Sequence, residues 1–466
     1  MAQDKQLKDI YAKRGGRLVT HPLLQKYLPR VQEDLAATYS RDLHKWLIIA
    51  PIIGVITGLV ITGMAVILLR EMWPAVLAYY LGHHWAIVPG LVAGFAVTGL
   101  IMQYLTPDAN EHSTEEVIRS YHEHEGEIDT RSFVPKMVAA LTTVGSGASS
   151  AMEGPAIYGG AAIGSWLWKR LKRFGKLEPR DRRIMLICGA AAGMSAIFRA
   201  PLTGIVFALE MPYKDDLAHE ALVPSLIASV VSYVTLGSFL GSAPVFDFAT
   251  ATTFKQADLY WCALLGLCIG LISLVFVVTF RRTRVWVVKN RAPHWLKMAV
   301  GGLLTGLCGL LFLHFYPGEL MPIGPNYEAV PEILNSAHST VELLVFSGLK
   351  LVATLFSIGA GGVSAMFVPL FLTGGSLGVA FAQAVAHSPA LELYAAVGMA
   401  SFISAAYKTP LAAVVFVAEA TGGHAFIVPA LIGAAVAYAV SGDASTSADQ
   451  RMHEVRSPEL SHTHDK

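Results

Sequence analysis

The sequence predicts an all-α, polytopic membrane protein built from two related halves. Hydrophobic residues make up 54% of the chain and charged residues only 15%, whereas a soluble domain carries roughly a quarter charged residues. Apolar runs that match the roughly 20 residues of a membrane-spanning helix recur at Trp46 to Leu69, Ile87 to Tyr104, Tyr260 to Phe280 and Met298 to Phe315. Two motifs also recur in the same order along the chain, which indicates an internal repeat.

The charge pattern divides the chain into a cytosolic amino-terminal segment (1–44), a transmembrane domain (45–441) and a short polar tail (442–466). Basic residues concentrate in the first segment, in Lys169 to Arg183 and in Arg281 to Lys297, and such segments stay on the cytoplasmic side. We therefore expect a multi-pass protein of the cell (inner) membrane with both termini cytoplasmic. The net charge of +1, without a basic patch, excludes a nucleic-acid binder.

The hydrophobic pattern predicts helices throughout, several of them too short to span a bilayer alone. Discontinuous helices that meet near the membrane midplane would produce this pattern. The predicted ranges are 45–69, 84–104, 113–125, 131–147, 154–172, 181–196, 201–212, 220–240, 257–285, 295–315, 328–355, 366–387, 392–406, 410–420 and 425–440.

The first repeated motif is a stretch rich in glycine and serine. Residues 145–155 (GSGASSAMEGP) align without a gap with residues 359–369 (GAGGVSAMFVP), and six positions are identical. The second motif matches residues 195–210 with residues 404–419. Together they define repeat halves of roughly 84–240 and 295–440. The alternative is that small residues recur only because they let membrane helices pack closely.

Each copy of the first motif ends on a proline, Pro155 or Pro369, which suits the first turn of a helix. The preceding glycines and serines cannot hold an uninterrupted helix, so a helix starts part-way through the membrane. Non-helical backbone at that depth is tolerated only where it is buried in protein or lines a cavity. Paired interruptions in two halves mark a transporter's binding site, and the free N–H groups of the helix starts favour an anion.

Glu153 stands in an otherwise uncharged stretch from Ala139 to Trp168, where a charge costs roughly 2.5 to 3.5 kcal/mol on insertion scales. We expect its carboxylate at the N-terminus of the helix that starts at Gly154 and Pro155, competing with a permeant anion for the same N–H groups. Protonation would release the side chain, open the path and let Glu153 carry a proton. The alternative is a glutamate that only satisfies its own helix dipole.

Residues 151–155 (AMEGP) resemble the Gly-Lys/Arg-Glu-Gly-Pro signature of the CLC family of chloride channels and chloride/proton antiporters. The resemblance continues through residues 189–193, 198–202 and 366–369 and from Pro410 to Glu419. It implies an inverted-repeat fold of tilted, discontinuous helices, a homodimer with one pore per subunit, and an anion path lined by four helix starts. It also places the external gating glutamate at Glu153 and an anion-coordinating backbone amide at Phe367.

Three positions depart from the pattern of that family. By register from Pro107, the serine that holds the central anion falls at His112, and Ser113 to Glu116 predicts a capping box at a helix start. A histidine donates a hydrogen bond when neutral and adds charge when protonated, so anion binding at His112 would tighten at low pH. The alternative is an ordinary polar loop residue.

The other two departures lie on the inner side of the expected path. The internal proton glutamate should follow Glu210, but that position is Met211, which leaves Glu210 as a candidate inner proton route. The pore tyrosine is also missing. By register its position falls at Thr446 or Ser447, whose hydroxyls can still donate to an anion.

The sequence therefore favours transport of chloride or a similar small anion by proton-linked exchange gated by Glu153. A passive gated anion channel is the alternative, because of Met211. A distant alternative is an intramembrane metalloenzyme that uses His112, His122 and His124 and needs Glu123 or Glu125 to face the helix bundle, although the metalloprotease signature is absent.

The expected partners are the anion, protons, the lipid bilayer and a second copy of the chain. We expect no enzyme activity, cofactor, metal or nucleic acid. The chain resembles the short form of the family, without regulatory domains. The residues expected at the anion are His112, Ser113, Met152, Gly154, Met366, Phe367, Val368, Thr446 and Ser447.

Overall fold

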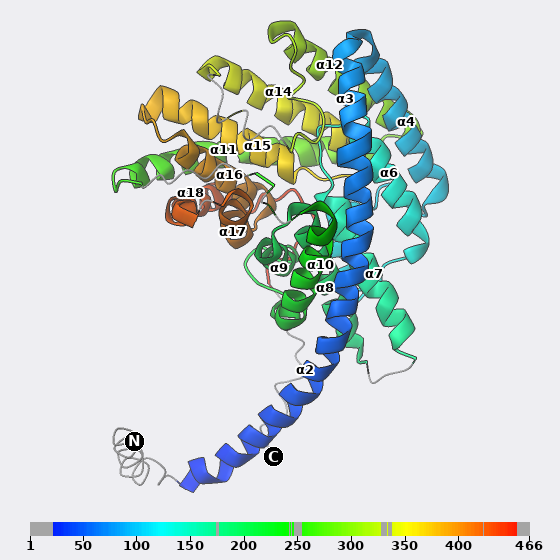
Figure 1. Ribbon diagram of the computed structural model, residues 1–466, viewed down its shortest axis with the longest axis vertical. Coiled ribbons are helices and arrows are strands. Elements are labelled where there is room, and N and C mark those ends of the chain that lie inside the picture. Colours follow the sequence, from blue (N-terminus) through cyan, green and yellow to red (C-terminus); the bar gives the residue numbers. More distant parts are fainter. Residues whose placement is uncertain are drawn as a thin grey trace. The chain divides into compact units, whose positions relative to one another are not determined.

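The computed structural model describes residues 22–173, 177–241, 243, 245–246, 254–327, 333, 338–422 and 424–453, with side chains from residue 44 onward except that of His424 (Figure 1). The chain forms two compact units, Met1–Ile49 and Ala50–Lys466. The first contains the amino-terminal part of a long helix, α2. Most of the predicted amino-terminal segment and most of the predicted polar tail lie outside the residues whose side chains are described.

The described residues form helices and two isolated β-bridges, without a strand. The helices are α2 (Pro22–Ala65), α3 (Trp73–Gly82), α4 (Ile87–Leu105), α5 (Ser113–Glu123), α6 (Phe133–Gly145), α7 (Glu153–Leu171), α8 (Pro179–Phe198), α9 (Pro201–Glu210), α10 (Leu222–Leu240), α11 (Asp258–Lys289), α12 (His294–Phe315), α14 (Thr340–Gly359), α15 (Phe367–Phe381), α16 (Leu391–Tyr407), α17 (Pro410–Thr421) and α18 (Ile427–Val440). Two π-helical turns, η1 (Val66–Met72) and η5 (Ala382–Ala386), extend α2 and α15, and 3₁₀ turns lie at His84–Ala86, Thr130–Ser132, His219–Ala221 and His424–Phe426.

The prediction of an all-helical membrane fold is confirmed. Among the described residues, seven helical stretches are long and apolar enough to span a membrane. The first runs to Gly82 instead of ending near residue 69, because η1 joins α2 to α3 without a break. The helix predicted at 328–355 begins at Thr340, where the Ser339 side chain accepts a hydrogen bond from the N–H of Glu342; residues 328–332 and 334–337 lie outside the described part.

The two copies of the glycine-rich motif form matching linkers, one between α6 and α7 and one between α14 and α15. A glycine with a left-handed backbone follows each preceding helix: Gly147 has a φ of 107° and Gly361 a φ of 115°. Ala151 and Ala365 then exchange backbone hydrogen bonds of 3.0 and 3.1 Å in an antiparallel bridge. Reciprocal contact between equivalent residues is what a two-fold axis produces, so the linkers are related by a local two-fold axis within one chain.

The Gly-Gly pairs that follow the motif allow two very close helix crossings. α7 packs on α8, and a Cβ at Gly160 would lie 1.9 Å from the backbone oxygen of Gly189. α15 packs on α16 in the same way, and a Cβ at Gly374 would lie 2.4 Å from the backbone oxygen of Gly398. No side chain fits at either crossing, which explains why glycine recurs at equivalent positions of the two halves.

The second repeated motif forms a reciprocal pair of helix caps. Both carboxylate oxygens of Glu210, at the end of α9, accept hydrogen bonds from the N-terminus of α17, from Leu411 N (3.0 Å) and Ala412 N (2.7 Å). Glu419, near the end of α17, likewise accepts from Leu202 N (3.0 Å) and Thr203 N (2.8 Å) at the start of α9. Each carboxylate stabilises the positive end of the other helix, and Figure 1 shows α9 and α17 near each other.

Apolar side chains also lie exposed along whole helix faces. On α11 the exposed residues Leu264, Leu267, Leu271 and Val275 are spaced three or four apart and so share one face. Exposed apolar stripes of this kind are unusual on soluble proteins. They suit contact with lipid.

Candidate functional site

Glu153 and Phe367 begin the two helices that follow the matching linkers, α7 and α15. Glu153 is almost completely buried, and its Oε1 accepts a hydrogen bond of 2.8 Å from the backbone N of Phe367. Its other oxygen, Oε2, has no hydrogen-bond partner among the described residues. The carboxylate therefore lies at the N-terminus of α15 in the other half, where the N–H of Val368 also acts on it, and it stays next to the N–H at the start of its own helix α7. The Glu153 side chain thus occupies a backbone N–H at the start of α15. An anion could bind the same N–H, so the expected competition for helix N–H groups stays a prediction.

Two tyrosine hydroxyls occupy the amides next to this contact. The N–H of Met366, just before α15, donates to the hydroxyl of Tyr407 (3.2 Å). The N–H of Met152, just before α7, donates to the hydroxyl of Tyr327 (3.3 Å). Each hydroxyl accepts from the backbone and so keeps its own proton to donate. Two of the amides expected to bind an anion, those of Met152 and Met366, are thus already bonded to hydroxyl groups.

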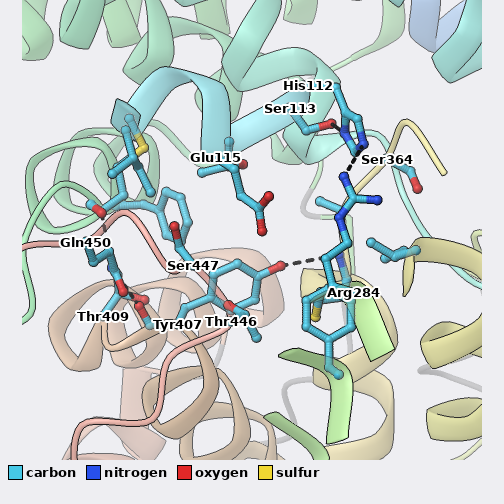
Figure 2. A pocket seen from close by; sticks show the side chains of 18 residues that line it. His112, Ser113, Glu115, Arg284, Ser364, Tyr407, Thr409, Thr446, Ser447 and Gln450 are labelled. Atoms are coloured by element: carbon cyan, nitrogen blue, oxygen red, sulfur yellow. Dashed lines mark hydrogen bonds between the residues drawn. The ribbon is translucent and has the colours of Figure 1, made fainter. Parts of the chain in front are cut away.

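A cavity of about 50 Å³ lies beside this region (Figure 2). Its volume suits small ions or waters. Among its lining residues are five expected at the anion, namely His112, Ser113, Met366, Thr446 and Ser447. The buried hydroxyl oxygens of Thr446 and Ser447, and those of Ser364 and Thr409 in the same lining, have no hydrogen-bond partner among the described residues.

The remaining candidates lie outside the cavity lining. Glu153, Phe367, Val368, Met152 and Gly154 surround the junction of the two linkers and are buried. Gly154 connects this junction to the cavity, because a Cβ there would lie 3.0 Å from the Cβ of Ser113 and 2.8 Å from that of Ala365. The candidate site therefore has two adjoining parts, the Glu153 contact and the cavity.

Ser113 begins α5 with a left-handed φ of 59°, a conformation that costs free energy in a non-glycine residue and is concentrated at functional sites. The predicted capping box is wrong. The N-cap residue, His112, makes no side-chain cap bond, and Glu116 is instead paired with Lys136 in a buried salt bridge of 2.6 Å. This ion pair directs the Glu116 carboxylate to Lys136 and away from its own helix start.

Two charged groups that the sequence did not single out face the cavity, Arg284 and Glu115 (Figure 2). Arg284 was grouped with the cytosolic basic residues because it follows Arg281 and Arg282, yet its Nη2 lies 3.3 Å from Nε2 of His112. Tyr407 was missed as well. Its sequence signal is its place in the second repeated motif, where it pairs with Phe198; in the structure it ends α16, directly before Lys408 with a left-handed φ of 58°.

The residues of the metalloenzyme alternative do not converge. Nε2 of His122 is 2.7 Å from the backbone oxygen of Pro212, and Glu123 and Glu125, one of which had to face the bundle, are both exposed. The exposed segment instead pairs with basic side chains: a hydrogen bond from Lys169 lowers the pKa of Glu127. Among the described residues, one group has ligand atoms close enough to hold a metal, Glu319, His338 and Glu342, and it does not line the cavity.

Comparisons with known proteins agree with this architecture. Residues 93–442 match the family described as voltage gated chloride channel. The H(+)/Cl(-) exchange transporter ClcA of Yersinia pestis bv. Antiqua (strain Angola) is 28% identical over 403 residues, which cover 83% of this chain and 82% of that protein.

Two solved structures share the fold. A CLC-type fluoride/proton antiporter superposes with a TM-score of 0.76 at 24% identity, covering 88% of this chain and 98% of that one. A slow cyanobacterial Cl-/H+ antiporter gives a TM-score of 0.74 at 22% identity, covering 85% and 94%.

The fold and the site define a multi-pass integral membrane protein in which two inverted halves bring helix starts to one buried site, as in ion transporters. The chain belongs to the voltage gated chloride channel family. Membership confirms the resemblance found in the sequence.

Proposed function

We propose that this protein transports chloride or a similar small anion in exchange for protons, with Glu153 as the gate. The observation that carries the proposal is the hydrogen bond from Phe367 N to Glu153 Oε1 (2.8 Å). A carboxylate bound at a helix N-terminus is a protein-borne anion in an anion site. A free anion can take its place only after the carboxylate leaves.

The exchange follows from the chemistry of that contact. When ionised, Glu153 is held by the partial positive charge at the start of α15 and blocks the path. When protonated, it loses this attraction, leaves the amide, and an anion from the adjoining cavity takes its place. Release of the proton on the opposite side returns the carboxylate to α15. One residue thus alternates between holding a proton and closing the anion path.

A proton also has to pass between Glu153 and the side of the membrane on which the basic segments lie. Met211 lines the cavity and cannot carry it. Both oxygens of Glu210 are bonded to α17, whereas the carboxylate of Glu115 faces the cavity (Figure 2). We assign the inner proton step to Glu115, and Glu210 is the second candidate.

A passive gated anion channel is the second candidate function, and Met211 is the observation that favours it. Liposomes that contain the purified protein separate the two functions. If the protein exchanges the two ions, an imposed chloride gradient should drive protons across the membrane in the direction opposite to chloride. A pH electrode records this proton movement. Free chloride passage without proton movement would favour the channel. No passage of chloride, fluoride or nitrate would contradict anion transport altogether.

We propose a homodimer in the cell membrane with both termini cytoplasmic, supported by the basic segments Lys169 to Arg183 and Arg281 to Lys297. The exposed apolar faces supply surface for both lipid and a second copy. Chemical cross-linking in native membranes tests the dimer, and labelling of a single cysteine placed at the exposed Arg282 from either side tests the orientation.

A further inference from the structure

Arg284 enters the protein interior from a helix whose neighbouring arginines are exposed. It lies near the end of α11, and Arg281 and Arg282 before it face outward. Its Nη2 donates to the backbone oxygen of Asn110 (2.9 Å) and lies 3.3 Å from Nε2 of His112. Gly361 borders this group, because a Cβ there would lie 2.9 Å from the ring of His294 and in ordinary contact, 3.4 Å, with Arg284 Nη1. The guanidinium is therefore fixed beside the imidazole ring.

The contact with Arg284 determines which nitrogen of His112 carries the proton. A guanidinium remains charged and can only donate hydrogen bonds, so Nε2 of His112 must accept. A ring that accepts at Nε2 is neutral and has its proton on Nδ1. Nδ1 lies 3.4 Å from Oγ of Ser113 (Figure 2). The ring thus donates to that hydroxyl oxygen, and the hydroxyl proton of Ser113 is left to point elsewhere.

Ser113 is placed where a donated proton would meet an anion. It lines the cavity, its backbone is held in the left-handed region, and it packs against Gly154 next to Glu153. We infer that Arg284 and His112 form a relay that fixes the Ser113 hydroxyl as a hydrogen-bond donor to the transported anion. The inference rests on the proposed function. Arg284 and His112 are positioning residues, and Ser113 is the residue that touches the anion.

Simple charge attraction by Arg284 or His112 is a weaker account. The carboxylate of Glu115 faces the same cavity and offsets the charge of Arg284 there. Burial opposes a positive charge on the ring of His112 most strongly. Three neighbouring cationic or titratable groups add to this, namely Arg284 of α11, Lys136 of α6 and His294 of α12. The relay therefore predicts the opposite of the sequence expectation, since His112 should not tighten anion binding at low pH.

The test measures chloride affinity by isothermal titration calorimetry on the full chain carrying Glu153→Gln, so that the gate does not titrate. With Arg284 present, affinity should stay constant between about pH 8 and about pH 5, because His112 stays neutral. Arg284→Met removes the donor that fixes the tautomer of the buried ring, so the Ser113 hydroxyl is no longer held as a donor. Chloride affinity should fall about threefold at every pH, as expected when one hydrogen bond to the anion is lost.

Three further variants isolate the relay. Adding His112→Phe to Arg284→Met should cause no further loss of chloride affinity, because both residues act through the same Ser113 hydroxyl. Arg284→Lys keeps a cationic donor and should restore the affinity. Arg282→Met removes an exposed charge from the same helix and should leave the affinity unchanged.

Unchanged chloride affinity in Arg284→Met, or a further loss on adding His112→Phe, would overturn the relay. If Arg284→Met does not fold, His112→Phe in the Glu153→Gln protein decides. It should weaken chloride binding by about threefold or more at every pH, because the Ser113 hydroxyl is no longer held, and unchanged affinity would overturn the relay. Failure of the Glu153→Gln protein itself to bind chloride would instead contradict the proposed function.

Discussion

Glu153 and Phe367 occupy equivalent positions in the two halves of the chain, 214 residues apart, and the carboxylate of one accepts a hydrogen bond from the backbone N–H of the other. The repeat thus does more than duplicate a helix start. One copy of the motif supplies an anion-binding amide, and the other supplies the side chain that occupies it. The contact joins the two halves at the point where the proposed anion path is closed.

Tyr407 and Tyr327, whose hydroxyls accept hydrogen bonds from the two linkers, should differ in their effect on anion binding. Tyr407 lines the cavity, so Tyr407→Phe removes a hydroxyl that can donate to the anion and should weaken chloride affinity by about two- to tenfold. Tyr327→Phe removes the equivalent hydroxyl from Met152 N but does not border the cavity, so its effect should be smaller. Calorimetric titration with chloride measures both. Equal losses in the two variants would show that the hydroxyls act only by holding the linkers.

The carboxylates Glu115 and Glu210 should separate proton coupling from stability. Glu115→Gln should lower chloride-driven proton movement in liposomes by about 100-fold, the lower end of what a positioned proton-transfer group contributes, while chloride still passes. Glu210→Gln should keep the coupling and lower the free energy of unfolding by about 1–3 kcal/mol, because it weakens the cap on α17. Loss of coupling in Glu210→Gln alone would assign the inner proton route to Glu210.

The close helix crossing at Gly160 should tolerate no side chain. Gly160→Ala places a Cβ 1.9 Å from a backbone oxygen of α8, so α7 and α8 must separate, at a cost of about 3 kcal/mol or more. Gly348→Ala is a matched control in α14, where an added Cβ meets nothing, and it should stabilise the helix by about 0.5–1 kcal/mol. Thermal unfolding in detergent compares them. Equal melting temperatures would contradict the crossing geometry.

The sequence predicted those features that depend on local pattern. Gly145 to Pro155 and Gly359 to Pro369 showed where helices must break, and their alignment paired Glu153 with Phe367. Hydropathy predicted the membrane-spanning helices, because a segment in contact with lipid must be apolar and must satisfy its backbone hydrogen bonds within a helix. The family resemblance supplied the role of Glu153, which composition alone would have left as a buried charge.

The features that were missed depend on contacts between residues far apart in the chain. Arg284 and His112 are 172 positions apart, and nothing in a run of basic residues shows that one of them turns inward. The contact of the Glu153 carboxylate with the N–H of Phe367 was missed for the same reason, since local pattern pointed only to its own helix start. The reciprocal caps of Glu210 and Glu419 likewise require the ends of two helices to meet. The matched motifs showed that the two segments are similar, but not that they are in contact.

The most direct test of the mutual exclusion between Glu153 and the anion is chloride affinity as a function of pH, measured by isothermal titration calorimetry. In the wild-type protein chloride binding should tighten as the pH falls, because protonation of Glu153 frees the N–H of Phe367. In Glu153→Gln the affinity should be high and independent of pH, while Glu220→Gln, which alters an exposed glutamate, should behave as the wild type. A wild-type affinity that does not change with pH, or a dependence that persists in Glu153→Gln, would contradict the gate.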